Sequence, residues 1–410
     1  MLTNKKLHMS SPHPVLPPLI HGARPEHVRE VNLRAVVDRL ARNGPMSRAD
    51  LARDLELSPT SVGRLIEELL RLGLVAEGER VVTGVGRPQT LLQLNAAAAS
   101  VAGVSVRSRW VRVRLADLDG RVVAAADEKH QDGSGEELAR QIAGLVARLR
   151  GPATGPLAAV VIGISGAWDA VRRRVLAAPN LPTLEGVDAL AAFRAALTGQ
   201  LGDGAMDLDN DVNLAAVGER TFGAARGVDD VFYLSVGSGV GGAAIVGGAV
   251  QRGASGLVGE VGYLPVTVDG REVRLEDALG RRALETFASE LGIRTDGDVL
   301  AWLERDDPEH QPLTDHVARV LAQALVAVVT TIDPRLVVLG GSVGRYGRAW
   351  TERTREQLAD RVPVVPDIAS TQLGREAPLL GAIEIARTLA RSSLVSGAVT
   401  SMAAREALAR

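Results

Sequence analysis

The sequence contains no cysteine, few aromatic residues and no long apolar run. Because there is no thiol, disulfides, thiol nucleophiles and cysteine-ligated zinc are all excluded. Aromatic residues make up only 3% of the 410 residues, so alanine, valine and leucine must fill the core. No segment approaches the roughly 20 apolar residues of a membrane span. Prolines 12, 14, 17 and 18 interrupt the stretch where a signal peptide needs its apolar run. We therefore expect a cytoplasmic protein with no membrane partner.

The bulk composition is that of a globular protein with more than one domain. Hydrophobic residues make up 46% and charged residues 23% of the sequence, which is ample material for a core. A chain of 410 residues exceeds one ordinary domain, so two or three are expected. The net charge of −2 does not itself indicate a nucleic-acid binder. One small domain can nevertheless carry DNA contacts while a larger acidic domain offsets its charge.

The N-terminal part divides into a tail and a small helical domain. Residues 1–27 are rich in proline, histidine and serine without apolar periodicity, which predicts a disordered tail. Residues 28–94 begin with three helical patterns, the first of which stops at Asn43-Gly44-Pro45. The second pattern opens at Ser47, whose spacing to Asp50 is that of a capping box.

The third helical pattern begins at Ser58 and is followed by strands. Ser58 is a good N-cap, Pro59 suits the first helical position, and Gly73 is a natural stop. Strand patterns follow at residues 74–77 and 81–83, about a turn, and at residues 91–94. Two helices across a tight turn, then a third element with β-wings, are typical of a winged helix-turn-helix.

In such a domain the third helix enters the major groove of DNA with its N-terminal end first. That end presents Thr60, Ser61 and Arg64 opposite the apolar face. Hydroxyls there suit phosphates and base edges, and an arginine can fork onto guanine. Arg48, near the start of the preceding helix, is positioned for a backbone phosphate, and Arg87, at the wing, for a minor groove.

From residue 95 onward, β-branched runs alternate with helical runs rich in alanine and leucine, which predicts an α/β domain. The predicted strands are Val101–Val106, Val111–Ala116, Val122–Ala126, Ala159–Ile164, Val231–Val236, Ala243–Val246 and Leu336–Leu339. The first three are close in sequence and should form an antiparallel meander. Later strands are separated by helices such as Glu136–Leu149 and Leu313–Thr330, and a late helix starting near Leu379 should pack back against the first lobe.

The small domain resembles the DNA-binding head of the ROK (repressor, ORF, kinase) family. The runs Ser47–Ala52, Leu57–Val62 and Leu69–Val75 carry this resemblance, and Gly86-Arg87-Pro88 is similar to the family's wing. The resemblance implies that residues 28–94 are a winged helix-turn-helix domain that binds double-stranded DNA.

The rest of the chain resembles the same family. Gly237-Ser238-Gly239-Val240-Gly241-Gly242, directly after a strand, looks like the second phosphate loop of the actin-like ATPase fold. The resemblance implies a two-lobed, ribonuclease H-like α/β domain of the sugar-kinase type over residues 95–410. Lobe one would span about 95–208 plus a C-terminal helix at about 378–398, and lobe two about 209–377.

Several further motifs resemble the family's sugar site. Asn210-Asp211 begins a segment like the ROK catalytic segment, although such a pair before a helix is also typical of a helix cap. Gly256–Tyr263 resembles the sugar loop, and Ala178–Pro182 the other sugar-contacting turn. Carboxylates and amides with defined hydrogen-bond directions suit a polyol. The ligand contacts implied by the resemblance are Asn180, Asn210, Asp211, Glu260, Tyr263 and Glu276.

Two departures from the family pattern argue, respectively, against kinase activity and against zinc binding. In the first phosphate loop Ser105 replaces the acid that would serve Mg²⁺, and Arg107 and Arg109 occupy positions that glycines keep open. Gly237, Ser238 and Gly239 would then be a vestigial phosphate loop. The family's zinc motif of three cysteines and one histidine is gone, with Tyr263 in place of the histidine. We expect no catalytic residue, no metal and no cofactor.

The leading interpretation is a DNA-binding regulator, a repressor of sugar-metabolism genes controlled by a monosaccharide or its phosphate. A homodimer or homotetramer would bind a palindromic operator. One alternative is an ATP-dependent ROK sugar kinase with an added DNA-binding domain. A remoter one is an interaction scaffold that does not bind DNA, since residues 24–90 hold 11 arginines and no lysine against 10 acidic residues.

Overall fold

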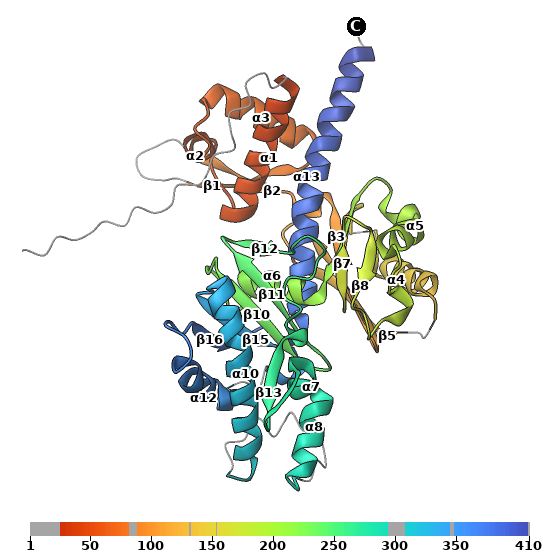
Figure 1. Ribbon diagram of the computed structural model, residues 1–410. Helices are drawn as coiled ribbons and strands as arrows, with labels where there is room; N and C mark the ends of the chain where they lie inside the picture. Colours follow the sequence, from red (N-terminus) through yellow and green to blue (C-terminus); the bar gives the residue numbers. More distant parts are fainter. Residues whose placement is uncertain are drawn as a thin grey trace, which may run out of the picture.

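The structure, a computed structural model, describes residues 25–81, 88–130, 133–152, 154–293, 308–344 and 348–408. It contains an N-terminal head (residues 25–94) and two α/β lobes, and its last helix, α13 (Ala377–Leu408), runs past the lobes and along the head (Figure 1). The expected tail, up to residue 24, and the wing segment 82–87 with Arg87 lie outside the described residues.

The head consists of three helices and a two-stranded antiparallel sheet: α1 (Pro25–Asn43), α2 (Arg48–Asp54), α3 (Pro59–Arg71), β1 (Val75–Val81) and β2 (Gln89–Leu94). Both predicted N-caps are present, because the Ser47 hydroxyl accepts from the Asp50 amide at 3.2 Å and the Ser58 hydroxyl from the Ser61 amide at 3.1 Å. The first strand pattern expected and the start of the second belong to one strand, β1, while residues 82 and 83 lie outside the described residues. The pairing of β1 with β2 resumes after a bulge between Glu77 and Arg80.

Lobe one is built on a five-stranded sheet with the order β5-β4-β3-β6-β9. Its strands are β3 (Ser100–Arg107), β4 (Trp110–Asp117), β5 (Val122–Lys129), β6 (Leu157–Ile164) and β9 (Ala205–Asn210). The antiparallel meander predicted for the first three is confirmed, and β6 and β9 join it in parallel. One hydrophobic cluster joins this sheet to α4 (Gly135–Leu149) and α5 (Ala189–Leu201), and a short hairpin of β7 (Ala167–Asp169) and β8 (Arg174–Leu176) lies beside them.

Lobe two repeats this plan with the order β12-β11-β10-β15-β16. Its strands are β10 (Val231–Val236), β11 (Val240–Val246), β12 (Ala249–Gln251), β15 (Leu336–Gly340) and β16 (Asp367–Ser370), beside a hairpin of β13 (Pro265–Val268) and β14 (Arg271–Arg274). Its helices are α7 (Leu275–Leu279), α8 (Arg281–Glu290), α10 (Gln311–Ile332), α11 (Gly341–Gly344) and α12 (Arg348–Ala359). By length and composition α10 could cross a membrane, but 56% of its apolar stretch is buried, and it forms part of the core of this lobe.

Two helices cross in close contact where the lobes join. These are α13 and α6 (Asp211–Phe222), and a glycine on each allows the backbones to approach. A Cβ on Gly218 of α6 would lie 2.3 Å from the Ala377 carbonyl oxygen, and one on Gly381 of α13 would lie 1.8 Å from the Leu214 oxygen. Real Cβ atoms do not approach so closely, so both positions require glycine as the helices stand.

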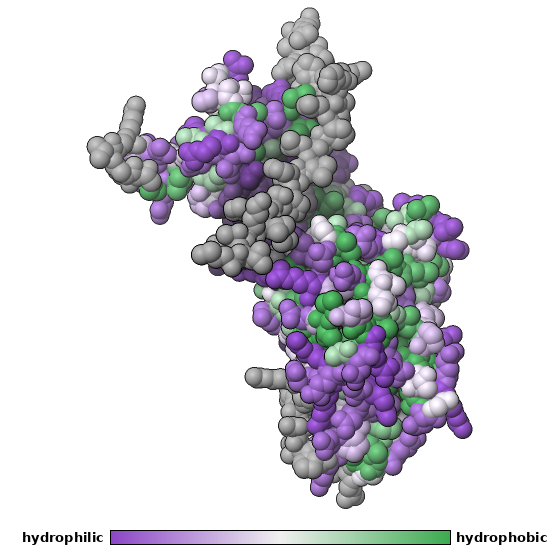
Figure 2. Space-filling model, turned by 60° about the vertical axis from the view of Figure 1, so that its left-hand side comes forward, coloured by the Kyte–Doolittle hydropathy of each residue, from purple (hydrophilic) through white to green (hydrophobic). Residues whose placement is uncertain are grey.

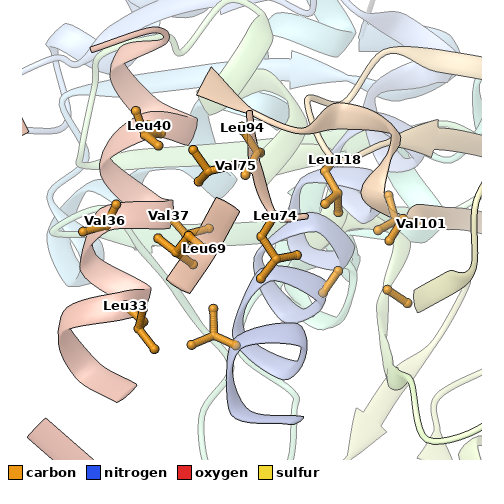
Figure 3. Close-up of a cluster of buried hydrophobic side chains, with 14 of the residues drawn as sticks. Leu33, Val36, Val37, Leu40, Leu69, Leu74, Val75, Leu94, Val101 and Leu118 are labelled. Atoms are coloured by element: carbon orange, nitrogen blue, oxygen red, sulfur yellow. The ribbon is translucent and has the colours of Figure 1, made fainter. Parts of the chain in front are cut away.

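The last helix also holds the head, which the sequence analysis did not predict. The helix expected at about 378–398 continues to Leu408 and packs against α1. Val395 and Val399 of α13 belong to the same hydrophobic cluster as the apolar face of α1, and that cluster extends to Val101 in lobe one (Figure 3). The head therefore shares its core with lobe one, while the face of it seen in Figure 2 is mostly hydrophilic.

Polar contacts reinforce this junction. The Ser396 hydroxyl on α13 donates to the Glu30 carboxylate at 2.7 Å and accepts from the Arg34 guanidinium at 2.5 Å. Arg391, also on α13 and only 8% exposed, contacts Asp38 of α1 at 3.4 Å. The orientation of the head on the lobes is thus set by both apolar packing and directional bonds.

The close crossing predicts opposite effects for two glycines of α13. Gly381→Ala should lower the free energy of unfolding by about 1–3 kcal/mol, because the methyl group would overlap the Leu214 carbonyl. Gly397→Ala, whose Cβ would meet nothing within 4 Å, should be neutral or stabilise by up to about 1 kcal/mol through helix propensity. Urea denaturation of both variants measures the difference, and equal effects would contradict the close contact.

Candidate functional site

A cleft of about 1470 Å³ is lined by residues of both lobes. Its lining includes five of the six predicted ligand residues, namely Asn180, Asn210, Asp211, Glu260 and Glu276, together with Gly237, Ser238 and Gly239. Residues that are separated by almost 100 positions in the sequence therefore meet in one cavity. The exception is Tyr263, which is not among the lining residues; its side chain is 56% exposed and its ring lies 5.2 Å from the Arg274 guanidinium carbon.

The strand register of lobe one places the polar residues at one edge of the sheet. Val106 of β3, Ile164 of β6 and Asn210 of β9 occupy one row across three parallel strands. The residues that follow them, Arg107 and Asp211 among them, leave the sheet at its carboxyl edge. In open α/β sheets this edge is where ligands bind.

Asn210 and Asp211 form the junction between β9 and α6. The Asn210 side-chain oxygen accepts from the Val212 amide at 2.7 Å, so this residue is the N-cap of α6, and its amide nitrogen donates to a Glu260 oxygen at 3.3 Å. The cap and the site contact are thus two roles of one side chain. Asp211 is the first residue of the helix and is only 4% exposed.

A salt bridge joins the Asp211 carboxylate to the Arg107 guanidinium, with 2.7 Å between Oδ2 and Nη2. Burial raises the pKa of the Asp211 carboxyl above its ordinary value, and the Arg107 charge opposes that rise. The Arg107 side chain itself is 47% exposed and lines the cleft. An arginine from the first turn of lobe one therefore neutralises the carboxylate that the family pattern would use as a general base.

Glu260 is positioned by a close contact between two glycines. The Gly242 amide donates to the Gly259 carbonyl at 2.6 Å, and Gly259 has a φ of +96°, a left-handed conformation that favours glycine. A Cβ on Gly259 would lie 2.1 Å from the Gly242 oxygen, so the loop lies directly against β11. Burial, and then the nearby Asp211 and Glu276 charges, raise the pKa of Glu260 to about 7.

Glu276 supports the glycine loop from within the cleft. Its Oε2 atom accepts from the Val240 amide at 3.0 Å, and a Cβ on Gly239 would approach the same oxygen to 2.8 Å. One oxygen of the carboxylate is therefore occupied in holding the loop.

Other residues of the site were not singled out from the sequence. Trp110, Ser165 and Ser342 also line the cleft. Asp209, 4% exposed, accepts from Arg252 at 2.6 Å and from Asn213 at 2.8 Å, and so joins the two lobes. The contact of Asp209 with Arg252 is formed only in the folded structure and has no signal in the sequence. For Arg107 there was one signal, because it lies just after the end of a predicted strand.

The residues predicted to contact DNA lie together on the head. Thr60, Ser61 and Arg64 are all exposed on α3, and Arg48 begins α2 with its guanidinium 3.3 Å from Glu77 on β1. The Ser61 hydroxyl also contacts the Ser58 hydroxyl at 2.9 Å. Arg87 lies in the segment that the structure does not describe.

The structure offers no metal centre in the described part of the chain, where no three histidine or carboxylate side chains cluster in a way that could hold an ion. The loop that resembles the family's zinc region is instead held by packing, since Val266 is buried in the core of lobe two.

The raised pKa of Glu260 predicts a pH dependence of stability. The folded protein retains a proton that the unfolded chain, with the ordinary value of 4.5, has released. The free energy of unfolding should therefore fall as the pH rises from about 4.5 to 7, and Glu260→Gln should remove this part of the slope. Thermal denaturation between pH 5 and 8 measures it, with exposed Glu272→Gln as the control. Parallel curves for wild type and Glu260→Gln would contradict the assignment.

Three proteins illustrate what the chain is similar to. The xylose repressor of Caldicellulosiruptor bescii is 25% identical over 82% of this chain and 88% of its own length. The crystal structure of a ROK family transcriptional regulator, a homologue of the E. coli MLC protein, aligns with 91% of this chain and all of its own, at a TM-score of 0.77 and 20% identity. The ROK hexokinase of Thermus thermophilus aligns with 70% of this chain and 97% of its own, at a TM-score of 0.57 and 31% identity.

These likenesses differ in extent, since the two regulators align with more of the chain than the hexokinase does. The actin-like fold of the two lobes agrees with both kinds of relative. The sequence profile of the ROK family matches residues 101–389, which is well over half of the chain. The chain therefore belongs to the ROK family.

Proposed function

We propose that this protein is a sugar-responsive transcriptional repressor. One observation carries the proposal. Helix α13 contacts both the head, which presents an exposed helix suited to DNA, and α6, which begins in a polar cleft suited to a polyol. The likeness to the xylose repressor, which extends over 82% of this chain, supports it. Such a protein acts on the chromosome, and so we place it in the cytoplasm.

The head, residues 28–94 in this proposal, serves as a winged helix-turn-helix. Helix α3 enters the major groove with Thr60, Ser61 and Arg64, while Arg48 binds a phosphate and Arg87 the minor groove. The apolar face of α3, with Val62, Ile66 and Leu69 buried, leaves its polar face free for this contact. A homodimer or homotetramer would present two heads to a palindromic operator.

The cleft between the lobes serves as the sensor. Asn180, Asn210, Asp211 and Glu260 receive the hydroxyls of a monosaccharide or its phosphate, and lobe closure changes the orientation of α13 and of the head. A ligand can shift this equilibrium only through a difference in its affinity for the two arrangements.

The rival function is an ATP-dependent sugar kinase with an added head. The retained Asp211 and the glycine loop in the cleft favour it. The salt bridge to Arg107 weighs against it, because a carboxylate paired with a guanidinium is a poor general base. Ser105, 5% exposed within β3, offers no carboxylate for Mg²⁺. A coupled ATP assay over a hexose panel, with turnover abolished in Asp211→Asn, would establish the kinase instead.

Replacing Arg64 should weaken specific DNA binding. Arg64→Ala is expected to cost about 1–3 kcal/mol at the operator, the contribution of an arginine that forks onto guanine. Arg42→Ala, exposed at the end of α1, is the matched control and should change affinity little. The operator is first found by genomic DNA capture with the purified protein. Equal losses for both variants would point to non-specific charge, and no loss on replacing Arg64 and Arg87 together would favour the scaffold.

Replacing cleft residues should uncouple the sensor from the head. Asp211→Ala and Glu260→Ala are expected to keep full operator affinity and to lose the response to the effector found in a sugar panel, because both side chains face the cleft and not the head. Operator binding in gel-shift titrations with and without sugar provides the measurement. Variants that still respond normally would show that the ligand binds elsewhere.

A further inference from the structure

The cleft is lined by two exposed arginines that lie close together in the sequence, one of which pairs with Asp211. Arg107 and Arg109, from the end of β3 and the turn that follows it, both line the cleft and are exposed. The salt bridge to Asp211 uses one terminal nitrogen of Arg107. A guanidinium has five N–H donors, so Arg107 retains others for a ligand. No carboxylate pairs with Arg109 in the described ranges.

Two of the carboxylates in the cleft, Glu276 and Glu260, are not free anions, and the others are accompanied there by further arginines: the lining also holds Asp269, Asp277, Glu285 and Glu290 with Arg271, Arg281 and Arg282. One oxygen of Glu276 is bound by the Val240 amide. Glu260, with its pKa raised to about 7, is protonated in a large fraction of molecules near neutral pH. Ser238 and Ser342 add hydroxyl donors to the cleft, and a Cβ on Gly237 would lie 3.2 Å from the Ser342 hydroxyl oxygen, so the two loops meet.

We propose that the cleft binds a sugar that carries an anionic group, a phosphate ester or a carboxylate, and that Arg107, assisted by Arg109, recognises that group. This inference rests on the proposed sugar effector and specifies its chemical class. A sugar substituent that reaches Asp211 comes within range of the guanidinium 2.7 Å away. Charge-assisted bonds from arginine to phosphate or carboxylate are short and directional, so this contact selects the charged sugar over the neutral one.

The inference also accounts for the aromatic residue beside these arginines. Trp110 follows Arg109, lines the cleft and is 39% exposed, whereas the other two tryptophans in the described part of the chain, Trp168 and Trp350, are buried. Its ring offers an apolar platform for a sugar face next to the charged group. Its fluorescence also provides a direct signal of binding.

The test uses the full-length protein and matched sugar pairs. Glucose and glucose 6-phosphate, mannose and mannose 6-phosphate, and ribose and ribose 5-phosphate are titrated by tryptophan fluorescence and calorimetry. Glucuronate is included as the carboxylate and inorganic phosphate as the bare anion. In at least one pair the ester, or glucuronate against glucose, should bind about tenfold tighter or more, since a hydrogen bond to a charged group contributes at least that much.

The variants assign this preference to Arg107. Arg107→Gln should reduce the preference to about threefold or less, while Arg107→Lys should retain part of it. Arg109→Gln, an exposed side chain that does not threaten folding, should reduce it partly. Arg121→Gln, exposed in the turn between β4 and β5, should leave it unchanged.

The outcomes separate this inference from the proposed function. A neutral sugar that binds as tightly as its ester and releases the operator would overturn the anionic class and leave the repressor standing. Inorganic phosphate that binds as tightly as the esters, or an undiminished preference in Arg107→Gln, would equally overturn it. If no sugar of the panel binds a protein that still holds its operator, the sugar effector and this inference both fail.

Discussion

The contact between α6 and α13 is the constraint on which the rest of the structure depends. Glycines at positions 218 and 381 bring the two helix backbones together, with no side chain between them to absorb a displacement. Helix α6 begins at Asp211 in the cleft, and α13 continues to the head. A displacement of α6 must therefore displace α13 as well. The helix that begins in the cleft and the helix that contacts the head are thus joined by a steric requirement.

The charge states of the carboxyl groups in the cleft depend on their burial. A carboxylate as enclosed as Asp211 is costly unless a cation or a proton accompanies it. In this chain Arg107 supplies the cation, and Glu260 nearby acquires the proton. The one side chain that a family kinase would use as the general base, Asp211, is thereby held in an ion pair. The cavity between the lobes is thus lined by polar groups that are paired or hydrogen-bonded to one another.

Local features of this protein were predictable from its sequence, and contacts between distant segments were not. Ser47 and Ser58 were identified as caps because capping depends on residues three apart. The antiparallel meander followed from short turns between apolar runs. The family motifs placed Asn180, Asp211 and Glu260 in one site. Tyr263 was assigned to that site by its place in a motif, but the short helical turn at residues 261–263 leaves it outside the lining.

Other features that were not predicted from the sequence depend on contacts between distant segments. The packing of α13 on α1 could not be inferred, because it joins segments that are more than 350 residues apart in the sequence. The pairing of Arg107 with Asp211 depends on two parallel strands separated by a third, which no local spacing encodes. Arginine in place of glycine was visible in the sequence, but its partner was not.

The shared core of the head and lobe one has a consequence for how such proteins can be recombined. Val395 and Val399 of the C-terminal helix complete the apolar interior of the N-terminal segment. The two ends of the polypeptide thus form one folding unit, and the head is not a cassette that can be cut at residue 94 and fused to another sensor. A chimera that exchanged the head would have to exchange α1 and the end of α13 together.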